Sequence, residues 1–102
     1  PITRTKICGG GAKSPLWCKM IANILNLKVD KIESEEGPAL GAAMLAAVGC
    51  GVYGSVEEIA EKMVKVVDTI EPDPSIAAKY DEKYAQFKQI YPALKPVFDV
   101  IK

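Results

Sequence analysis

The sequence of 102 residues contains no histidine, and its 13 basic residues balance its 13 acidic ones. The absence of histidine excludes general-base catalysis by imidazole and most zinc sites from these residues. Because charges of both signs are interspersed, no electrostatic footprint for nucleic acid or for an anionic membrane is present. We therefore expect neither nucleic acid nor a membrane as a partner.

Long hydrophobic runs are also missing. The most apolar segment, residues 38–48, is far shorter than the roughly 20 residues that a bilayer span requires. No basic-then-apolar leader is visible, so we expect a soluble, cytoplasmic protein. The three cysteines, Cys8, Cys18 and Cys50, lie in apolar stretches. Their odd number and wide spacing predict small buried hydrophobic residues in a reducing cytosol.

The length of the chain allows one domain with a single core but little room for a two-lobed active site. The sequence begins with Pro1 rather than Met, and residues 2–7 already read as a strand. We therefore expect residues 1–102 to form one domain that is part of a longer protein.

Hydrophobic periodicity predicts a β-α-β unit in the first third of the chain. Residues 2–8 alternate and end at glycine, which suits a strand that leads into a loop. Ser14 is a good N-cap, Pro15 suits the first helical position, and apolar residues then recur at helical spacing up to Leu25. Residues 28–33 alternate again, which predicts a second strand beside the first in a right-handed unit.

The rest of the sequence predicts helices. Residues 39–48 are small and apolar on nearly every face, which predicts a helix buried on several sides. Ser55 and Glu58 form a capping box for a further helix, whose apolar stripe we extend to Val66 and Val67. Residues 69–74 form a proline-bracketed connector that could include a brief strand.

An aromatic and aliphatic stripe at helical spacing runs from Ile76 to Ile101. It predicts a terminal helix that is kinked near Pro92 and packs back on the core. The alternatives for this stripe are a subunit contact, such as that of a homodimer, or a docking face for further chain.

Three successive glycines, Gly9 to Gly11, join the first predicted strand to the first predicted helix. Glycine has no Cβ, so the main chain at this junction can take positive φ and lie flat against a ligand. The amides that open the following helix face outward, where an anion or a polar ring edge can meet them. The alternative is a tight turn without a ligand.

Two known nucleotide-binding loops fit this turn poorly. A Walker loop needs contiguous Gly-Lys-Ser/Thr, whereas one residue separates Gly11 from Lys13. The dinucleotide fingerprint fits better, because Gly9 and Gly11 match its first two glycines and Asp30 stands where an acidic ribose ligand is expected. However, Ser14 occupies the third glycine position and Asp30 falls inside the predicted strand. Dinucleotide binding therefore stays an alternative.

Four blocks, residues 9–17, 36–43, 48–53 and 91–94, resemble in the same order the C-terminal part of FGGY-family carbohydrate kinases, the xylulose kinases in particular. This family is part of the actin-like ATPase superfamily, and the resemblance covers essentially the whole chain. It implies an α/β fold: the C-terminal portion of the second actin-like, ribonuclease H-like lobe, with a short β-α-β unit and three or four packed helices.

The resemblance also implies an activity, namely the transfer of phosphate from ATP, with Mg²⁺, to D-xylulose or to another ketose, a polyol or glycerol. ATP or ADP would lie between two lobes, with the main chain of Gly10, Gly11 and Ala12 against the adenosine. Lys13 would stand at the rim near ribose or phosphate, and a solvated loop lysine is the alternative.

The catalytic carboxylate, phosphate loops, metal site and sugar pocket would come from other parts of the protein. We expect no catalytic residue or metal ligand here, so the isolated chain would be inactive; the competing hypothesis is a non-catalytic scaffold or oligomerisation module.

Other residues near the turn receive structural interpretations. Trp17 begins the helical stripe and is expected in the core, with adenine stacking as the alternative. Glu36 is expected to be an exposed turn carboxylate, with a hydrogen bond to loop amides as the alternative. The small residues at positions 41–43 are expected to let their helix lie against the glycine turn.

Overall fold

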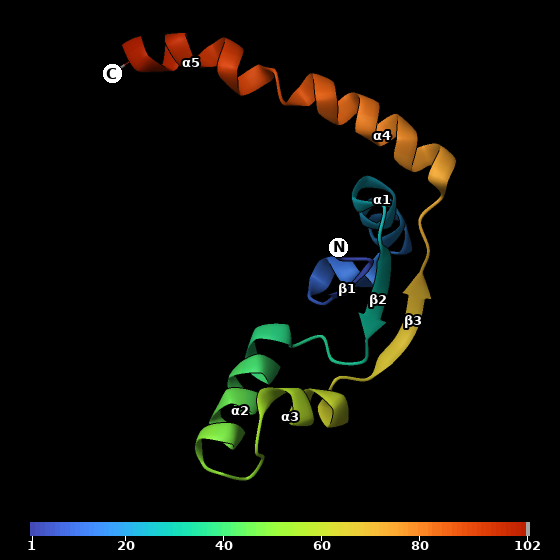
Figure 1. Cartoon of the computed structure of the whole chain (residues 1–102), viewed down its shortest axis with the longest axis vertical. Coiled ribbons are helices and arrows are strands. Elements are labelled where there is room, and N and C mark those ends of the chain that lie inside the picture. The colour runs from blue at the N-terminus through green and yellow to red at the C-terminus, as the bar shows by residue number, and fades with distance from the viewer. Residues whose placement is uncertain (102) are drawn as a thin grey trace.

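The computed structural model describes residues 1–101, which form a three-stranded sheet with helices at both of its ends (Figure 1). The elements follow in the order β1 (Arg4–Ile7), the 3-10 helix η1 (Gly10–Lys13), α1 (Pro15–Leu25), β2 (Lys28–Ile32), α2 (Gly37–Gly49), α3 (Val56–Met63), β3 (Val66–Ile70), α4 (Pro74–Phe87) and α5 (Ile90–Val100). This is the α/β class that the sequence predicts.

The predicted β-α-β unit is confirmed. β1 pairs in parallel with β2, with Arg4 opposite Lys28, and α1 connects the two strands. The Ser14 hydroxyl accepts a hydrogen bond from the Trp17 amide at 3.2 Å and so caps α1. Asn26 ends the helix in the left-handed conformation, with φ of 50°. Strand β2 then starts at Lys28, as the sequence pattern predicts.

The third strand corrects the predicted extent of α3. The helix ends at Met63, and Val66 and Val67 belong to β3, which pairs antiparallel with β2. β-branched side chains such as valine favour strands over helices. Pairing with β2 then satisfies the backbone N–H and C=O groups of this segment without a helix. The N-terminus of α3 agrees with the prediction, because the Ser55 hydroxyl accepts from the Glu58 amide at 3.1 Å. The Glu58 carboxylate accepts in return from the amide of Gly54, also at 3.1 Å.

The core is small for a chain of this length. Its buried apolar residues come from η1, α1, β2, α2, α3 and α4, and they are Ala12, Cys18, Ala22, Val29, Met44, Ile59 and Ala77. The radius of gyration is 18.6 Å, whereas a compact domain of 100 residues has a value of about 13 Å. The chain is thus open, with much apolar surface left uncovered by its own residues.

Helix α2 is less buried than the sequence predicts. Met44 is its one buried residue, and Leu45 is 63% exposed. A helix that is apolar on all faces is expected to pack against several other elements. Here α2 packs mainly on α3, at the end of the sheet opposite α4 (Figure 1). A Cβ at Gly41 would meet nothing within 4 Å, so the helix does not need a small residue there to lie close to the glycine turn. The residue that allows the close contact is Gly37, where a Cβ would overlap the Cys8 side chain.

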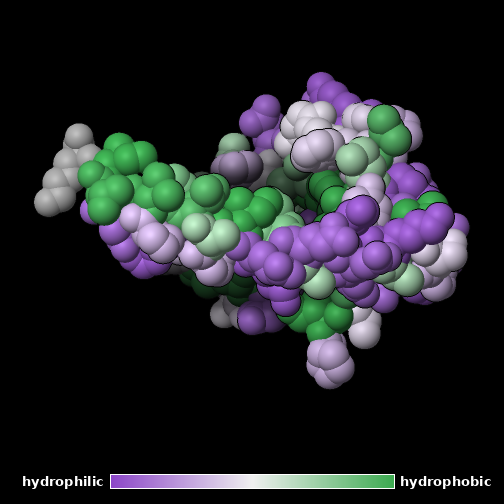
Figure 2. All heavy atoms as spheres, turned by 90° about the horizontal axis from the view of Figure 1, so that it is seen from above, coloured by the Kyte–Doolittle hydropathy of each residue, from purple (hydrophilic) through white to green (hydrophobic). Residues whose placement is uncertain are grey.

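The C-terminal helices do not pack back on the core, so that prediction is wrong. The first turns of α4 contact α1 and bury Ala77, whereas α4 and α5 then continue as an arm that extends from the sheet (Figure 1). The helix break lies at Lys88 and Gln89, before Pro92. From Tyr84 onward, the apolar residues of the stripe stay exposed. Figure 2 shows hydrophobic side chains gathered along the arm toward its end.

The cysteines follow the prediction only in part. Cys18 is buried, whereas Cys8 and Cys50 are exposed, and all three are free. Cys8 lies at the end of β1 and Cys50 at the end of α2, where this open chain leaves both side chains uncovered. Among residues 1–101, no helix is both long and apolar enough to cross a membrane.

Candidate functional site

The glycine turn leaves the carboxyl end of β1 and folds into the short helix η1. Gly9 has φ of 87°, a conformation that favours glycine. Its carbonyl accepts from the Ala12 amide at 3.1 Å, and the Gly11 carbonyl accepts from the Ser14 amide at the same distance. The Cys18 thiol also donates to the Ala12 carbonyl, at 3.4 Å. These bonds hold the main chain of residues 9–14 as a wall of backbone at one edge of the sheet.

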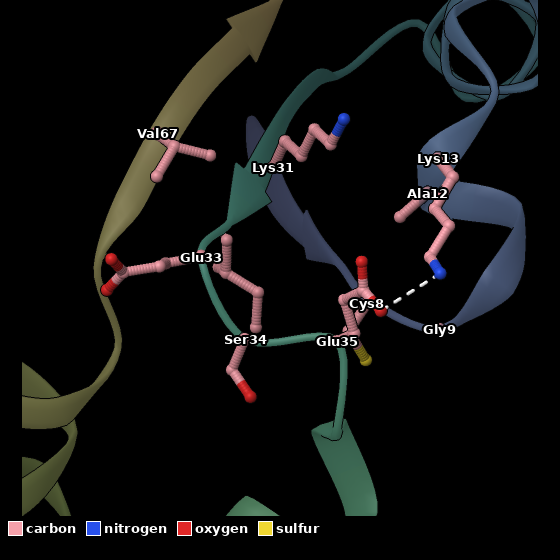
Figure 3. Close-up of a pocket in the computed structure, with 10 residues that line it drawn as sticks. Cys8, Gly9, Ala12, Lys13, Lys31, Glu33, Ser34, Glu35 and Val67 are labelled. Carbon is pink, nitrogen blue, oxygen red and sulfur yellow. Dashed lines mark ion pairs between the residues drawn. The ribbon is translucent and has the colours of Figure 1, made fainter.

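A hollow of about 270 Å³ lies beside this wall, between η1 and the segment that follows β2 (Figure 3). Parallel strands place their carboxyl ends at the same edge of a sheet, and ligands of α/β proteins commonly bind outside such an edge. The hollow is lined by Cys8, Gly9, Ala12, Lys13, Lys31, Ile32, Glu33, Ser34, Glu35 and Val67. Its position therefore suits a ligand that contacts the glycine turn.

The residues predicted from the turn divide into two groups. Ala12 and Lys13 line the hollow, whereas Gly10 and Gly11 lie in the same short helix but do not line it. The indole of Trp17 packs against Gly11 so closely that a Cβ there would come within 2.8 Å of the indole Nε1. A Cβ on Gly10 would meet nothing within 4 Å. The main chain of Gly10 therefore borders open space.

Trp17 is 52% exposed, which corrects its predicted place in the core. It lies in the first turn of α1, and its ring covers Gly11 instead of pointing toward the buried residues Cys18 and Ala22. The predicted stripe is also wrong at its other end, because Ile24 and Leu25 are 47% and 51% exposed. The aromatic ring is a neighbour of the glycine turn, as the stacking alternative requires.

Lys13 is paired with Glu35, a residue that the sequence analysis did not single out. The Lys13 Nζ lies 3.0 Å from a carboxylate oxygen of Glu35, and both side chains are 63% exposed. Figure 3 shows the lysine reaching from η1 toward the carboxylate, beside Cys8. The predicted parallel pairing of the two strands could have pointed to Glu35. It follows β2, whose carboxyl end lies beside the carboxyl end of β1 and hence beside the glycine turn. The neighbouring Glu36 is exposed, as predicted, and does not line the hollow.

Asp30 has a structural role that leaves it unavailable to a ribose. It is 2% exposed, and its carboxylate accepts hydrogen bonds from Arg4 at 2.8 Å and from the Thr69 hydroxyl at 2.7 Å. The hydrogen bond from Arg4, and next that from Thr69, lower the pKa of Asp30 below its ordinary value. The dinucleotide alternative needs a free carboxylate here, so the structure does not support it.

Within residues 1–101, no three His, Cys, Asp or Glu side chains gather as a metal site would require. The carboxylates that line the hollow are those of Glu33 and Glu35, and the latter is engaged by Lys13. Mg²⁺ prefers several oxygen ligands in near-octahedral geometry. The residues of the hollow therefore do not fit Mg²⁺.

Comparison with known proteins gives consistent matches. Residues 1–50 match the C-terminal domain of the FGGY family of carbohydrate kinases. The xylulose kinase of Bacillus subtilis (strain 168) is 42% identical over 94 residues, which are 92% of this chain and 19% of that protein. The L-xylulose/3-keto-L-gulonate kinase of Escherichia coli (strain K12) is 32% identical over 90 residues, or 88% of this chain and 18% of that protein.

Solved structures agree with these matches. Ligand-bound xylulose kinase from Lactobacillus acidophilus superposes with a TM-score of 0.78 and 25% identity, covering 91% of this chain and 19% of that one. Gluconate kinase from the same species gives the same TM-score and identity, covering 90% of this chain and 18% of that one. The chain thus spans about a fifth of the length of the relatives it matches. Sequence and fold together show that it belongs to the FGGY family of carbohydrate kinases.

Proposed function

We propose that this chain supplies the adenosine-facing surface of an ATP-dependent xylulose kinase, which converts D-xylulose to D-xylulose 5-phosphate. The observation that carries the proposal is the glycine-rich main-chain wall of residues 9–12 beside a hollow at the carboxyl ends of β1 and β2. The similarity to xylulose kinases supports the nature of the substrate. The site that this proposal assigns to adenosine consists of Gly10, Gly11, Ala12 and Lys13.

The chemistry of the wall suits a purine nucleoside. A flat ring needs a surface without protruding side chains, and the main chain of η1 offers one because Gly10 borders open space. Ala12 and Gly9 extend that surface into the hollow, where Ile32 and Val67 add apolar contact. The wall is preorganised by its backbone hydrogen bonds, so ligand binding would cost little ordering of the loop.

The sugar acceptor could differ from D-xylulose. Relatives of this chain include kinases named for 3-keto-L-gulonate and for gluconate. In our proposal none of residues 1–101 touches the sugar, so a kinase of the same family for another polyhydroxy substrate is the second candidate. The choice between them is made by residues outside this chain.

The chain is proposed to act only together with further parts of such a kinase. Transfer of phosphate to a hydroxyl group needs a carboxylate base, phosphate-binding loops and Mg²⁺, and we assign none of these to the described residues. The isolated chain is therefore expected to be inactive. A cytoplasmic location is part of the same proposal.

A chimaera tests the proposal, with residues 1–102 replacing the matching segment of the Bacillus subtilis xylulose kinase. We expect it to phosphorylate D-xylulose. Gly10→Leu should raise the KM for ATP about tenfold or more and leave the KM for D-xylulose unchanged, because the new side chain enters the space meant for adenosine. Gly41→Leu is the matched control, since a Cβ there also meets nothing within 4 Å. An unchanged KM for ATP in Gly10→Leu would contradict the proposed site.

A further inference from the structure

The ion pair between Lys13 and Glu35 stands out among the charged contacts of residues 1–101. Five such pairs are formed in this part of the chain, and this is the one whose two members both line the hollow. Lys13 comes from η1 and Glu35 from the segment between β2 and α2, so the pair joins two elements across the hollow (Figure 3).

The pair contributes little to the stability of the fold. Both side chains are 63% exposed, and exposed ion pairs are screened by water and offset by the entropy of ordering two long side chains. The backbone bonds of η1 hold the turn without it. Both side chains are therefore able to turn toward a ligand at little cost.

The charge of Lys13 is balanced by its partner. A lysine that binds phosphate acts as a free point charge, whereas the ammonium of Lys13 already has a carboxylate 3.0 Å away. A neutral pair is poorly suited to attract a polyphosphate. It is well suited to a neutral group that both donates and accepts hydrogen bonds.

The two adjacent hydroxyl groups of a ribose are such a group. A carboxylate has two oxygens that accept from two O–H donors, and an ammonium group donates to a hydroxyl oxygen. The pair also stands next to Ala12, which belongs to the wall proposed for adenosine. A nucleoside whose base lies along residues 10–12 would carry its ribose toward Lys13 and Glu35.

We infer that Glu35 binds the ribose hydroxyl groups of the nucleotide and that Lys13 positions its carboxylate and donates to the same diol. This inference rests on the proposed nucleotide-binding function and assigns Glu35 as a residue that determines specificity for ribose. Lys13 then contacts the ribose rather than the phosphates.

The test measures binding of adenosine, ADP and 2′-deoxy-ADP to the chimaera by isothermal titration calorimetry. The unmodified chimaera should bind 2′-deoxy-ADP about tenfold more weakly than ADP, as expected for the loss of a hydrogen bond to a charged acceptor. In Glu35→Gln this preference should fall to about twofold or less. The affinities for adenosine and ADP should fall by similar factors, because the contact does not involve phosphate.

Glu33→Gln is the matched control, since it removes the same charge from the same hollow at a residue without an ion pair to Lys13. It should keep the preference for ADP over 2′-deoxy-ADP. Circular dichroism of each variant shows whether the fold is retained, and Glu35→Asp provides a second variant that keeps the charge and retracts it by one methylene group.

The outcomes separate this inference from the proposed function. If ADP binds but its preference over 2′-deoxy-ADP is the same in Glu35→Gln, the ribose role of Glu35 is wrong while the nucleotide site stands. If the variant weakens ADP but not adenosine, the pair serves the phosphates and the inference is likewise wrong. If the unmodified chimaera binds neither adenosine nor ADP, the proposed function itself fails.

Discussion

The guanidinium of Arg4 holds the buried carboxylate of Asp30, with the Arg4 Nε 2.7 Å from one carboxylate oxygen and an Nη 2.8 Å from the other. The Thr69 hydroxyl donates to the same carboxylate at 2.7 Å. Arg4, Asp30 and Thr69 belong to β1, β2 and β3, so one carboxylate links all three strands. This explains why an acidic residue stands inside an otherwise alternating strand.

The bonds from Arg4 and Thr69 make the stability of the chain depend on pH. They lower the pKa of Asp30 in the folded state, so the stabilisation is fully present above the pKa of the unfolded state. It is lost as the pH falls through the lower, folded-state pKa. Urea denaturation at a series of pH values between about 6 and 2 should show this loss.

Asp30→Asn should lower stability near neutral pH and make it less dependent on pH below 5. The slope should not vanish, because the pKa values of Glu58, Glu71 and Asp73 are also lowered. Asp68→Asn, which removes one carboxylate from an exposed position of β3, is the control variant. Equal pH profiles for Asp30→Asn and the unmodified chain would contradict the assignment.

The contact between Gly37 and Cys8 gives a second prediction. A Cβ at position 37 would overlap the Cys8 thiol, so Gly37→Ala should destabilise the chain by about 1–3 kcal/mol, as overpacking commonly does. Removing the sulfur in Cys8→Ala should recover part of that loss in the double variant. Thermal denaturation of the two single variants and the double variant measures the coupling. Additive effects would show that α2 does not start against the end of β1.

A third prediction separates the core from the exposed arm. Ile59 is 1% exposed, and Ile59→Ala should cost about 2–5 kcal/mol of unfolding free energy because it leaves a cavity. Leu94 in α5 is 43% exposed, and Leu94→Asn should change stability by about 0.5 kcal/mol or less. A large loss in Leu94→Asn would mean that the arm packs on the core, as the sequence pattern alone indicates.

The local structure could be predicted well because it depends on neighbouring residues. Capping by Ser14 and Ser55, the placement of Pro15 and the alternation of residues 28–33 correctly predict where α1, β2 and α3 begin. Burial could not be predicted in the same way. An apolar stripe shows that a surface avoids water, but it does not show whether this chain itself covers it, and for α2 and α5 it does not.

The candidate site could be predicted from the sequence only on one side of the hollow. The three glycines identify the turn through their backbone freedom, which is a property of the local sequence. Glu35 lies 22 positions after Lys13 and reaches it only because β1 and β2 pair in parallel. Sequence spacing does not reveal such a contact, and Asp30 shows the reverse case, since its spacing suits a ligand role that the Arg4 contact prevents.

The central claim is that the main chain of η1 contacts the adenosine of the nucleotide. A crystal structure of the chimaera with ADP tests it most directly. We predict that the purine lies against Gly10, Gly11 and Ala12, with the ribose within hydrogen-bond distance of Glu35. An ADP molecule bound elsewhere, with no contact to Gly10 or Ala12, would contradict the account.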